Sequence, residues 1–262
     1  MIYLRSRLFF LVIFLCIISS AAEKPEPGVD WVNRTVTAIG VSGDKGNRAS
    51  KIRVAKLTAI RDALELVKGM PVNSTTTVKN LMLESDVIKT KINGYIQNFE
   101  FENKPHYMSD GTIEIAVTIP LDGIMDQLVP SEIGDNPSVK SMESTSAPGA
   151  VFTGMIIDAS GLEVKPAIAP KIIDEDGKEI YGSAYVSREF AVKYGMAGYA
   201  RTLDQARINK DRIGEKPAVF KATEALGANK CDIRISNTQA DQIRSAAENL
   251  KFLEQCRVII IL

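Results

Sequence analysis

The sequence predicts an α+β fold: a helix packed on a mainly antiparallel sheet, then a second, mixed α/β module ending in a β-α-β unit. Asn47 to Val72 carries apolar residues at helical spacing, and residues 112–121 alternate apolar and polar residues as a half-buried strand does. Arg257 to Leu262 is a continuous apolar run, typical of a buried strand. We therefore expect two modules, at 29–129 and 150–262, joined by a Ser-, Pro- and Gly-rich linker at 130–149.

The predicted helix at 47–72 has a narrow apolar stripe with alanine at its centre. At about 100° per residue one face collects Ile52, Ala55, Ala59, Ala63, Leu66 and Met70, flanked by Ile60 and Val67. Because alanine is small, this face is expected to approach a sheet closely. Gly69 and Pro71 predict the end of the helix. The β-branched run from Val72 to Val78 is expected to form the next strand.

The rest of the first module is predicted to be mainly strands. Trp31 to Val41 is β-rich and precedes the helix, and a helical turn is expected near residues 81–84. Residues 94–103 and 112–121 are expected to pair as a hairpin around the turn signal Asp110-Gly111. The module therefore has the predicted order β-α-β-(short α)-β-β.

The second module is predicted to alternate strands with short helices. Strands are expected at 152–158, 171–174, 178–181, 217–222, 232–236 and 257–262, with a short helix at 188–194. Thr238 and Asp241 resemble a capping box at the start of a last helix, which extends to Leu253. The continuously apolar final strand is expected to lie centrally and to be covered on both faces.

Residues 1–22 are typical of a secretory signal peptide. Arg5 and Arg7 precede an apolar run from Leu8 to Ile18, and small residues follow at 20–22. A membrane anchor is the alternative, but the run is shorter than the roughly 20 apolar residues that span a bilayer. Lipid anchoring through Cys16 is disfavoured because Leu15 stands where a lipobox has a small residue. A periplasmic or secreted protein is expected.

Composition and histidine content argue against several functional classes. The 32 basic and 32 acidic residues balance, so the overall charge does not indicate nucleic-acid binding. His106 is the only histidine and has no cysteine nearby, which makes a surface position the better interpretation. The sequence therefore predicts no catalytic residues, no metal ligands and no cofactor.

Two cysteines remain after the predicted cleavage, Cys231 and Cys256. Each begins a strand-like segment, and a helical pattern lies between them. In a right-handed β-α-β unit both strand starts lie at the same end of the sheet, so a disulfide is one expectation in an oxidising compartment. A strand inserted between the two would separate the thiols beyond bonding distance.

Other residue groups each have two interpretations. Tyr181, Tyr185, Tyr194 and Tyr199 gather in a short window and suit an interaction surface, or serve as half-buried sheet residues. Asp174, Asp176 and Glu179 surround a glycine turn, where a solvated hairpin is favoured over a calcium loop. Gly40 to Gly46 is better interpreted as a flexible loop than as a phosphate cradle.

The helix and turn from Arg53 to Val72 resemble the signature of LPP-type bacterial outer-membrane lipoproteins. They are also similar to the N-terminal domain of flagellar assembly protein T. The matching features are Ala55, Ala59, Asp62, Ala63, Val67, Gly69 and the threonines at 75–77, continued by 85–88, 94–96 and Asp110-Gly111. The resemblance covers about 31–121 and implies a non-enzymatic envelope protein, without catalytic residues to carry over.

These observations favour an exported, non-enzymatic envelope protein that works through protein contacts, with a role at the outer membrane or flagellar base. Its partners would be envelope proteins or further copies of itself in a homo-oligomer, with peripheral association at the outer membrane. The alternative is a periplasmic ligand- or glycan-binding module, motivated by the tyrosines and by the carboxylates near Asp174. A hydrolase using Asp158 and Glu163 is the least favoured hypothesis.

Overall fold

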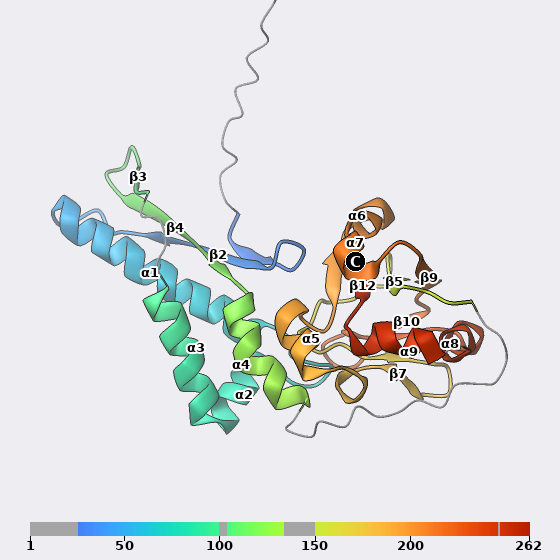
Figure 1. The fold of residues 1–262 in the computed structure, drawn as a ribbon. Helices are drawn as coiled ribbons and strands as arrows, with labels where there is room; N and C mark the ends of the chain where they lie inside the picture. The colour runs from blue at the N-terminus through green and yellow to red at the C-terminus, as the bar shows by residue number, and fades with distance from the viewer. Residues whose placement is uncertain (1–25, 100–103, 134–149, 246) are drawn as a thin grey trace, which may run out of the picture.

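The computed structural model describes residues 26–99, 104–133, 150–245 and 247–262. Within these ranges it has the predicted α+β architecture, with three four-stranded sheets and their helices (Figure 1). The predicted signal peptide and residues 134–149 of the predicted linker lie outside the described residues. Within the same ranges, no helix is both long and apolar enough to cross a membrane.

The first module is one antiparallel sheet with a long helix on one face. Its elements are β1 (Gly28–Asp30), β2 (Thr35–Val41), α1 (Arg48–Gly69), α2 (Val78–Glu84), α3 (Asp86–Asn98), β3 (His106–Tyr107), β4 (Ile113–Pro120) and α4 (Asp122–Ile133). The strand order is β1-β2-β4-β3. Helix α1 lies between this sheet and helices α2 and α3 (Figure 1).

Helix α1 confirms the predicted alanine ridge. Asn47 caps its start by accepting a hydrogen bond from Ser50 N at 2.9 Å. Ala55, Ala59 and Ala63 are fully buried. The close approach also needs Gly40 of β2, since a Cβ there would lie 2.0 Å from the carbonyl oxygen of Ala55. Small residues on both elements therefore set the distance between helix and sheet.

The strand predicted at 72–78 is wrong. Asn73 Oδ1 accepts hydrogen bonds from the backbone N–H groups of Thr75 and Thr76, both at 3.0 Å, and so closes a turn. Thr77 then caps α2 in a capping box with Asn80. Side-chain bonds to the backbone prevail here over the β-propensity of the threonines.

The hairpin predicted between 94–103 and 112–121 is also wrong in the described part of its first strand, and residues 100–103 lie outside the described residues. Residues Gly94 to Asn98 belong to α3, while residues 112–121 do contain the strand β4. β4 pairs along its length with β2, from Thr35 opposite Pro120 to Val41 opposite Glu114. The turn at Asp110-Gly111 is confirmed, but it joins β4 to the short β3.

The second module contains a parallel and a mixed sheet. Its strands are β5 (Gly154–Asp158), β6 (Ile172–Ile173), β7 (Glu179–Tyr181), β8 (Gly198–Ala200), β9 (Pro217–Lys221), β10 (Glu224–Leu226), β11 (Asp232–Arg234) and β12 (Val258–Ile261). Its helices are η1 (Ser183–Tyr185), α5 (Arg188–Tyr194), α6 (Leu203–Ile208), α7 (Lys210–Ile213), α8 (Asn237–Arg244) and α9 (Ala247–Glu254). The sheet orders are β8-β12-β5-β9 and β10-β11-β6-β7.

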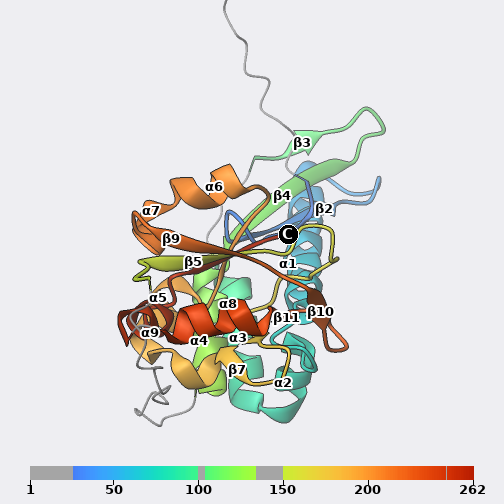
Figure 2. The ribbon, with the colours of Figure 1, turned by 90° about the vertical axis from the view of Figure 1, so that its right-hand side faces the viewer.

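The predicted central position of the final strand is confirmed. β12 is parallel to both neighbours, β5 and β8. Ile259 and Ile261 pack with Ala206 and Ile213 of α6 and α7, whereas Val258 and Ile260 belong to the main core. Figure 2 shows the corresponding layers, with α6 and α7 on one side of β5 and β9 and α8 and α9 on the other.

The end of the chain differs in detail from the predicted β-α-β unit. β11 and β12 do flank α8 and α9, but they belong to different sheets. The capping box predicted at Thr238 and Asp241 is wrong, because Ser236 caps α8 together with Gln239. The chain therefore passes from the mixed sheet to the parallel sheet through these two helices.

Candidate interaction site at the junction of the modules

The two modules pack against each other and share one hydrophobic core. A single cluster of buried residues runs from Val36 and Ala63 in the first module to Tyr199 and Ile260 in the second. The helices α4 and α5 lie side by side across this junction (Figure 1). The predicted linker begins too early, because α4 continues to Ile133.

The turn after α1 forms the first set of main-chain bonds across the junction. Ala169 N donates to Val72 O at 2.7 Å, and Ile168 N donates to Pro71 O at 3.1 Å. Asn229 adds a bond from its backbone N–H to Ser74 O at 3.0 Å. The segment predicted to be a strand is therefore a docking turn for the second module.

Two arginines meet at the junction, and one of them, Arg34, forms a second contact across it. Arg34, at φ 55°, pairs with Asp122 at 2.7 Å and donates to the carbonyl of Tyr194. Arg212 also donates to Tyr194 O, at 2.7 Å, and to Gly195 O and Val258 O at 2.8 and 2.9 Å. Burial lowers the pKa of Arg212. Both guanidinium groups therefore bind backbone carbonyls at the turn after α5.

Tyr199 closes the junction next to β1. Its ring meets that of Trp31 edge to face, with centroids 5.6 Å apart. Its hydroxyl accepts from Ala167 N at 2.8 Å and donates to Ala167 O at 2.7 Å. Burial raises the pKa of Tyr199 well above its ordinary value, so the hydroxyl stays protonated.

Beside this contact lies a groove of about 890 Å³. Trp31 and Val29 line it from the side of β1, and Asp62, Glu65 and Leu66 line it from α1. The second module contributes Lys165, Pro166 and Asn229. The groove combines an apolar lining with two carboxylates and one ammonium group, a composition suited to binding a polypeptide segment or a small molecule.

The four tyrosines predicted as an interaction surface separate into two pairs. That prediction is wrong for Tyr181 and Tyr199, which are buried and use their hydroxyls within the module. Tyr185 and Tyr194 are half-buried, and for them it stays a prediction. Tyr194 stacks on Phe190, with centroids 6.3 Å apart. The alternation of exposed and buried positions in this irregular segment was not readable from the sequence.

Of the two expectations for Cys231 and Cys256, a disulfide or separated thiols, the structure has the second, and both thiols are free and buried. Cys231 precedes β11 in the mixed sheet and Cys256 precedes β12 in the parallel sheet, so they do not share a β-α-β unit. Burial raises the pKa of Cys231 to about 12 and that of Cys256 to about 11.

Both thiols should therefore resist a thiol reagent in the folded protein at pH 8, because each is buried and protonated. After unfolding without reductant, Cys231 and Cys256 should both react in the mature protein. Ellman titration before and after addition of guanidinium chloride measures this. Two unreactive sulfurs in the unfolded, unreduced protein would instead reveal a bond between them.

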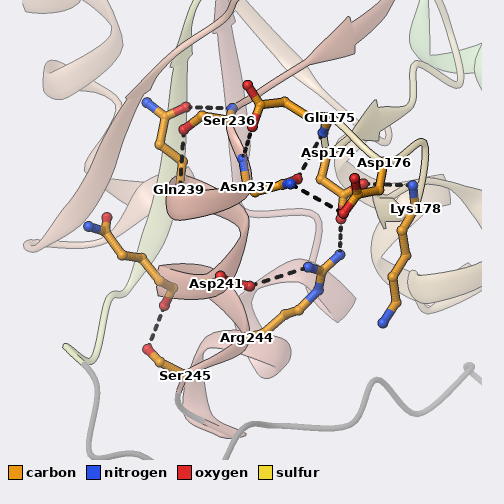
Figure 3. A network of polar contacts seen from close by, with 11 residues as sticks. Asp174, Glu175, Asp176, Lys178, Ser236, Asn237, Gln239, Asp241, Arg244 and Ser245 are labelled. Carbon is orange, nitrogen blue, oxygen red and sulfur yellow. Dashed lines mark hydrogen bonds and ion pairs between the residues drawn. The ribbon is translucent and has the colours of Figure 1, made fainter.

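Asp174 belongs to a structural polar network (Figure 3). Its carboxylate binds Arg244 Nη2 at 2.7 Å and accepts from the backbone N–H of Lys178 at 2.7 Å. Asn237 at the start of α8 bonds to both Glu175 and Asp176, at 2.9 and 3.2 Å. These bonds connect the β6–β7 turn to helix α8, as expected of a hairpin rather than a calcium loop.

The pKa of Asp174 reflects opposing effects. Burial alone would raise it, but the hydrogen bonds from Arg244 and Lys178 and the charge of Arg244 hold it below its ordinary value. A carboxyl with a lower pKa in the folded state stabilises the fold above its unfolded-state pKa. That contribution is lost as pH falls through the lower, folded-state pKa.

We expect Asp174→Asn to reduce the free energy of unfolding at pH 7 by about 3 kcal/mol, because it leaves Arg244 buried without its carboxylate. As the pH falls through the lowered folded-state pKa of Asp174, the difference from the parent should shrink, because the parent carboxyl becomes protonated. Urea unfolding at pH 7 and at a series of lower pH values measures this. The control Asp241→Asn removes an exposed carboxylate 3.6 Å from the same arginine and should cost about 0.5 kcal/mol or less. Equal losses in the two variants would contradict the assignment.

The remaining candidate residues do not converge. His106 is exposed on β3, as predicted. Asp158 accepts a hydrogen bond from Ser160 while Glu163 pairs with Lys230 at 2.8 Å, and both carboxyl pKa values are lowered, first by these hydrogen bonds. Across the part of the chain that the structure describes, no group of three His, Cys, Asp or Glu residues could hold a metal ion.

Part of the second module matches a known family. Residues 154–262, less than half of the chain, match the family model described as the second domain of Tp0624 from Treponema pallidum. The match begins at the first residue of β5 and contains both sheets of the second module. A comparison with curated proteins finds no match.

Proposed function

We propose that this chain is an exported, non-enzymatic bacterial envelope protein that works through protein contacts, with its two modules forming one scaffold. The junction carries this proposal. Arg34 binds the carbonyl of Tyr194 and the ring of Tyr199 packs on Trp31 across the junction, while Arg212 binds carbonyls within the second module. Together with the main-chain bonds of the turn after α1, these contacts fix one arrangement of the modules, and the polar groups at the junction have structural partners.

Three further observations support the proposed location and class. Residues 1–22 have the pattern of a signal peptide. Residues 154–262 are similar to a domain of a bacterial protein, Tp0624. The resemblance of residues 31–121 to LPP-type lipoproteins and to flagellar assembly protein T favours a role at the outer membrane or the flagellar base.

Fractionation of a bacterium that produces the full chain tests this proposal. The mature protein should leave the cytoplasm and co-sediment with outer-membrane or cell-wall material, and cross-linking should join it to envelope proteins or to further copies. A matched control without residues 1–22 should stay in the cytoplasm. A strict monomer that co-sediments with neither fraction would contradict the proposal.

A ligand- or glycan-binding module is the second candidate, and the groove beside Trp31 is the observation that favours it. Trp31 is the only tryptophan of the chain, so its fluorescence reports directly on this groove. Saturable quenching by soluble cell-wall glycan fragments, lost in Trp31→Ala, would favour this candidate. The Tyr185→Ala and Tyr194→Ala variants test whether the half-buried tyrosines contribute to the same binding.

A further inference from the structure

Half of strand β2 has an unpaired edge. β4 accompanies β2 from Thr35 to Val41 on one side. On the other side β1 reaches only Thr37, which lies opposite Gly28. The four residues from Ala38 to Val41 therefore form the edge of the sheet on this side (Figure 1).

The hydrogen-bonding pattern of the ladder shows which backbone groups face this edge. Just beyond the two ends of the β2–β4 pairing, Leu121 N donates to Arg34 O at 2.8 Å and Ser42 N donates to Ile113 O at 2.9 Å. Because antiparallel pairs alternate, the odd-numbered residues of β2 then direct their N–H and C=O groups away from β4. For Ile39 and Val41, no backbone hydrogen bond on this side is found among the described residues.

The neighbouring elements leave this edge open. Helix α1 cannot move across it, since its position is fixed by the contact of Ala55 and Ala59 with Gly40. β1 begins at Gly28, whose φ of +150° is unusual for a strand, and Pro27 precedes it. Proline is poorly accommodated in a continuing strand.

The groove at the junction begins along this edge. Ala38 and Ile39 line it together with Val29 and Trp31. Helix α1 contributes Leu66 and the carboxylates of Asp62 and Glu65 to its lining, and Asp62 lies 3.5 Å from the guanidinium of Arg61. Glu65 also pairs with Lys68 at 2.7 Å and stays largely exposed. The unpaired backbone groups at the edge of β2 therefore lie next to a groove that has an apolar lining and acidic side chains.

We propose that an extended polypeptide segment with alternating basic and apolar residues binds here by adding a strand to the edge of β2. In an extended polypeptide, every second residue directs its N–H and C=O groups to the same side. These groups match the spacing of the outward backbone groups of Ile39 and Val41. Because side chains alternate between the two faces of a strand, the segment's basic side chains lie on the α1 face, where Asp62 and Glu65 line the groove, and its apolar side chains lie on the opposite face beside Ile39 and Val41. This inference deepens the proposed function, on which it rests, by giving the site and chemistry of one partner segment.

A capped peptide of alternating lysine and valine tests the proposal with the fluorescence of Trp31 as readout. The peptide should produce a saturable change, and the corresponding glutamate–valine peptide should bind more weakly. N-methylation of all lysines or of all valines blocks alternate backbone N–H groups. One of these two methylated peptides should lose binding while the other retains it, because only one edge of the added strand pairs with β2.

Variants of the protein complete the test. Ile39→Pro removes an outward N–H without breaking the ladder to β4 and should weaken binding about tenfold or more, while Ile39→Thr retains binding. Asp62→Lys should weaken binding as well, whereas Asp204→Lys, on exposed α6, should not. Circular dichroism establishes that each variant is folded.

Three results would overturn the inference: no saturable change with the lysine–valine peptide, equal binding to Ile39→Pro, or equal binding of the acidic peptide. Concentration-dependent self-association that Ile39→Pro abolishes would identify a second copy of the chain as the occupant and reject the basic segment. If the peptide does not bind but the protein co-sediments with envelope fractions, the proposed function is supported and the proposed binding site at the edge of β2 is rejected.

Discussion

Replacing Arg212 by methionine should lower the free energy of unfolding by about 3 kcal/mol. Methionine replaces only the aliphatic part of the side chain and leaves the buried carbonyl oxygens of Gly195 and Val258 without the guanidinium that now binds them. The carbonyl of Tyr194 loses one of its two arginine donors and keeps Arg34. Removal of a desolvated charge offsets part of the loss, which is why the effect is smaller than three separate hydrogen bonds would give. Urea unfolding of the protein produced without residues 1–22 measures the change.

The matched control is Arg207→Met, on the exposed side of α6. It makes the same chemical change and should alter stability by about 0.5 kcal/mol or less. A similar loss in both variants would mean that Arg212 does not stabilise the fold through these carbonyls. Because Arg212 binds the carbonyls of both Tyr194 and Gly195, we further expect Arg212→Met to make the turn after α5 more susceptible to proteolysis, although Arg34 still binds Tyr194.

Gly40→Val should destabilise the first module by about 3 kcal/mol or more, because overpacking here meets backbone and not a flexible side chain. A Cβ at this position would lie 2.0 Å from Ala55 O and 2.3 Å from Ala59 N. Helix α1 would have to move away from β2 and open the alanine interface. Loss of helical circular dichroism at a lower urea concentration measures the effect.

Gly94→Ala is the control for this glycine. Gly94 lies within α3 and has no neighbouring atom within 4 Å of an added Cβ. Alanine there should stabilise the protein by about 0.5–1 kcal/mol through its higher helix propensity. If both glycine replacements were neutral, the close approach of α1 to β2 would be refuted.

Periodicity in the sequence correctly predicted those elements in which buried side chains recur at regular intervals. Helix α1 was predictable because its alanines repeat at helical spacing, and β12 because every residue from Val258 to Ile261 is apolar. Residues 72–78 were mispredicted because the side chain of Asn73 closes a turn. The tendency of Gly94 to Asn98 to form a strand was overridden by packing in α3, where Ile92 and Ile96 are buried.

The candidate site was harder to predict because its parts are far apart in the sequence. Arg34 and Arg212 have no motif around them, and their meeting at Tyr194 depends on how two modules pack. The groove likewise joins Trp31, Asp62 and Lys165. The two cysteines illustrate a different error. The strands that follow them, β11 and β12, are consecutive along the chain and were expected to share one sheet, but they belong to two different sheets. Only correlated substitutions at positions 34 and 122 could have indicated the salt bridge between Arg34 and Asp122.

The place of β12 between β5 and β8 has a consequence for biosynthesis. About a hundred residues separate β5 from its neighbour β12 along the chain. During translation, the backbone groups of β5 and β8 that will face β12 therefore wait until residues 258–261 have emerged. Until then the parallel sheet cannot close, and the nascent polypeptide stays uncommitted to its final structure. Under the export that we propose, this delay would help the chain to remain unfolded until it has passed through a translocation channel.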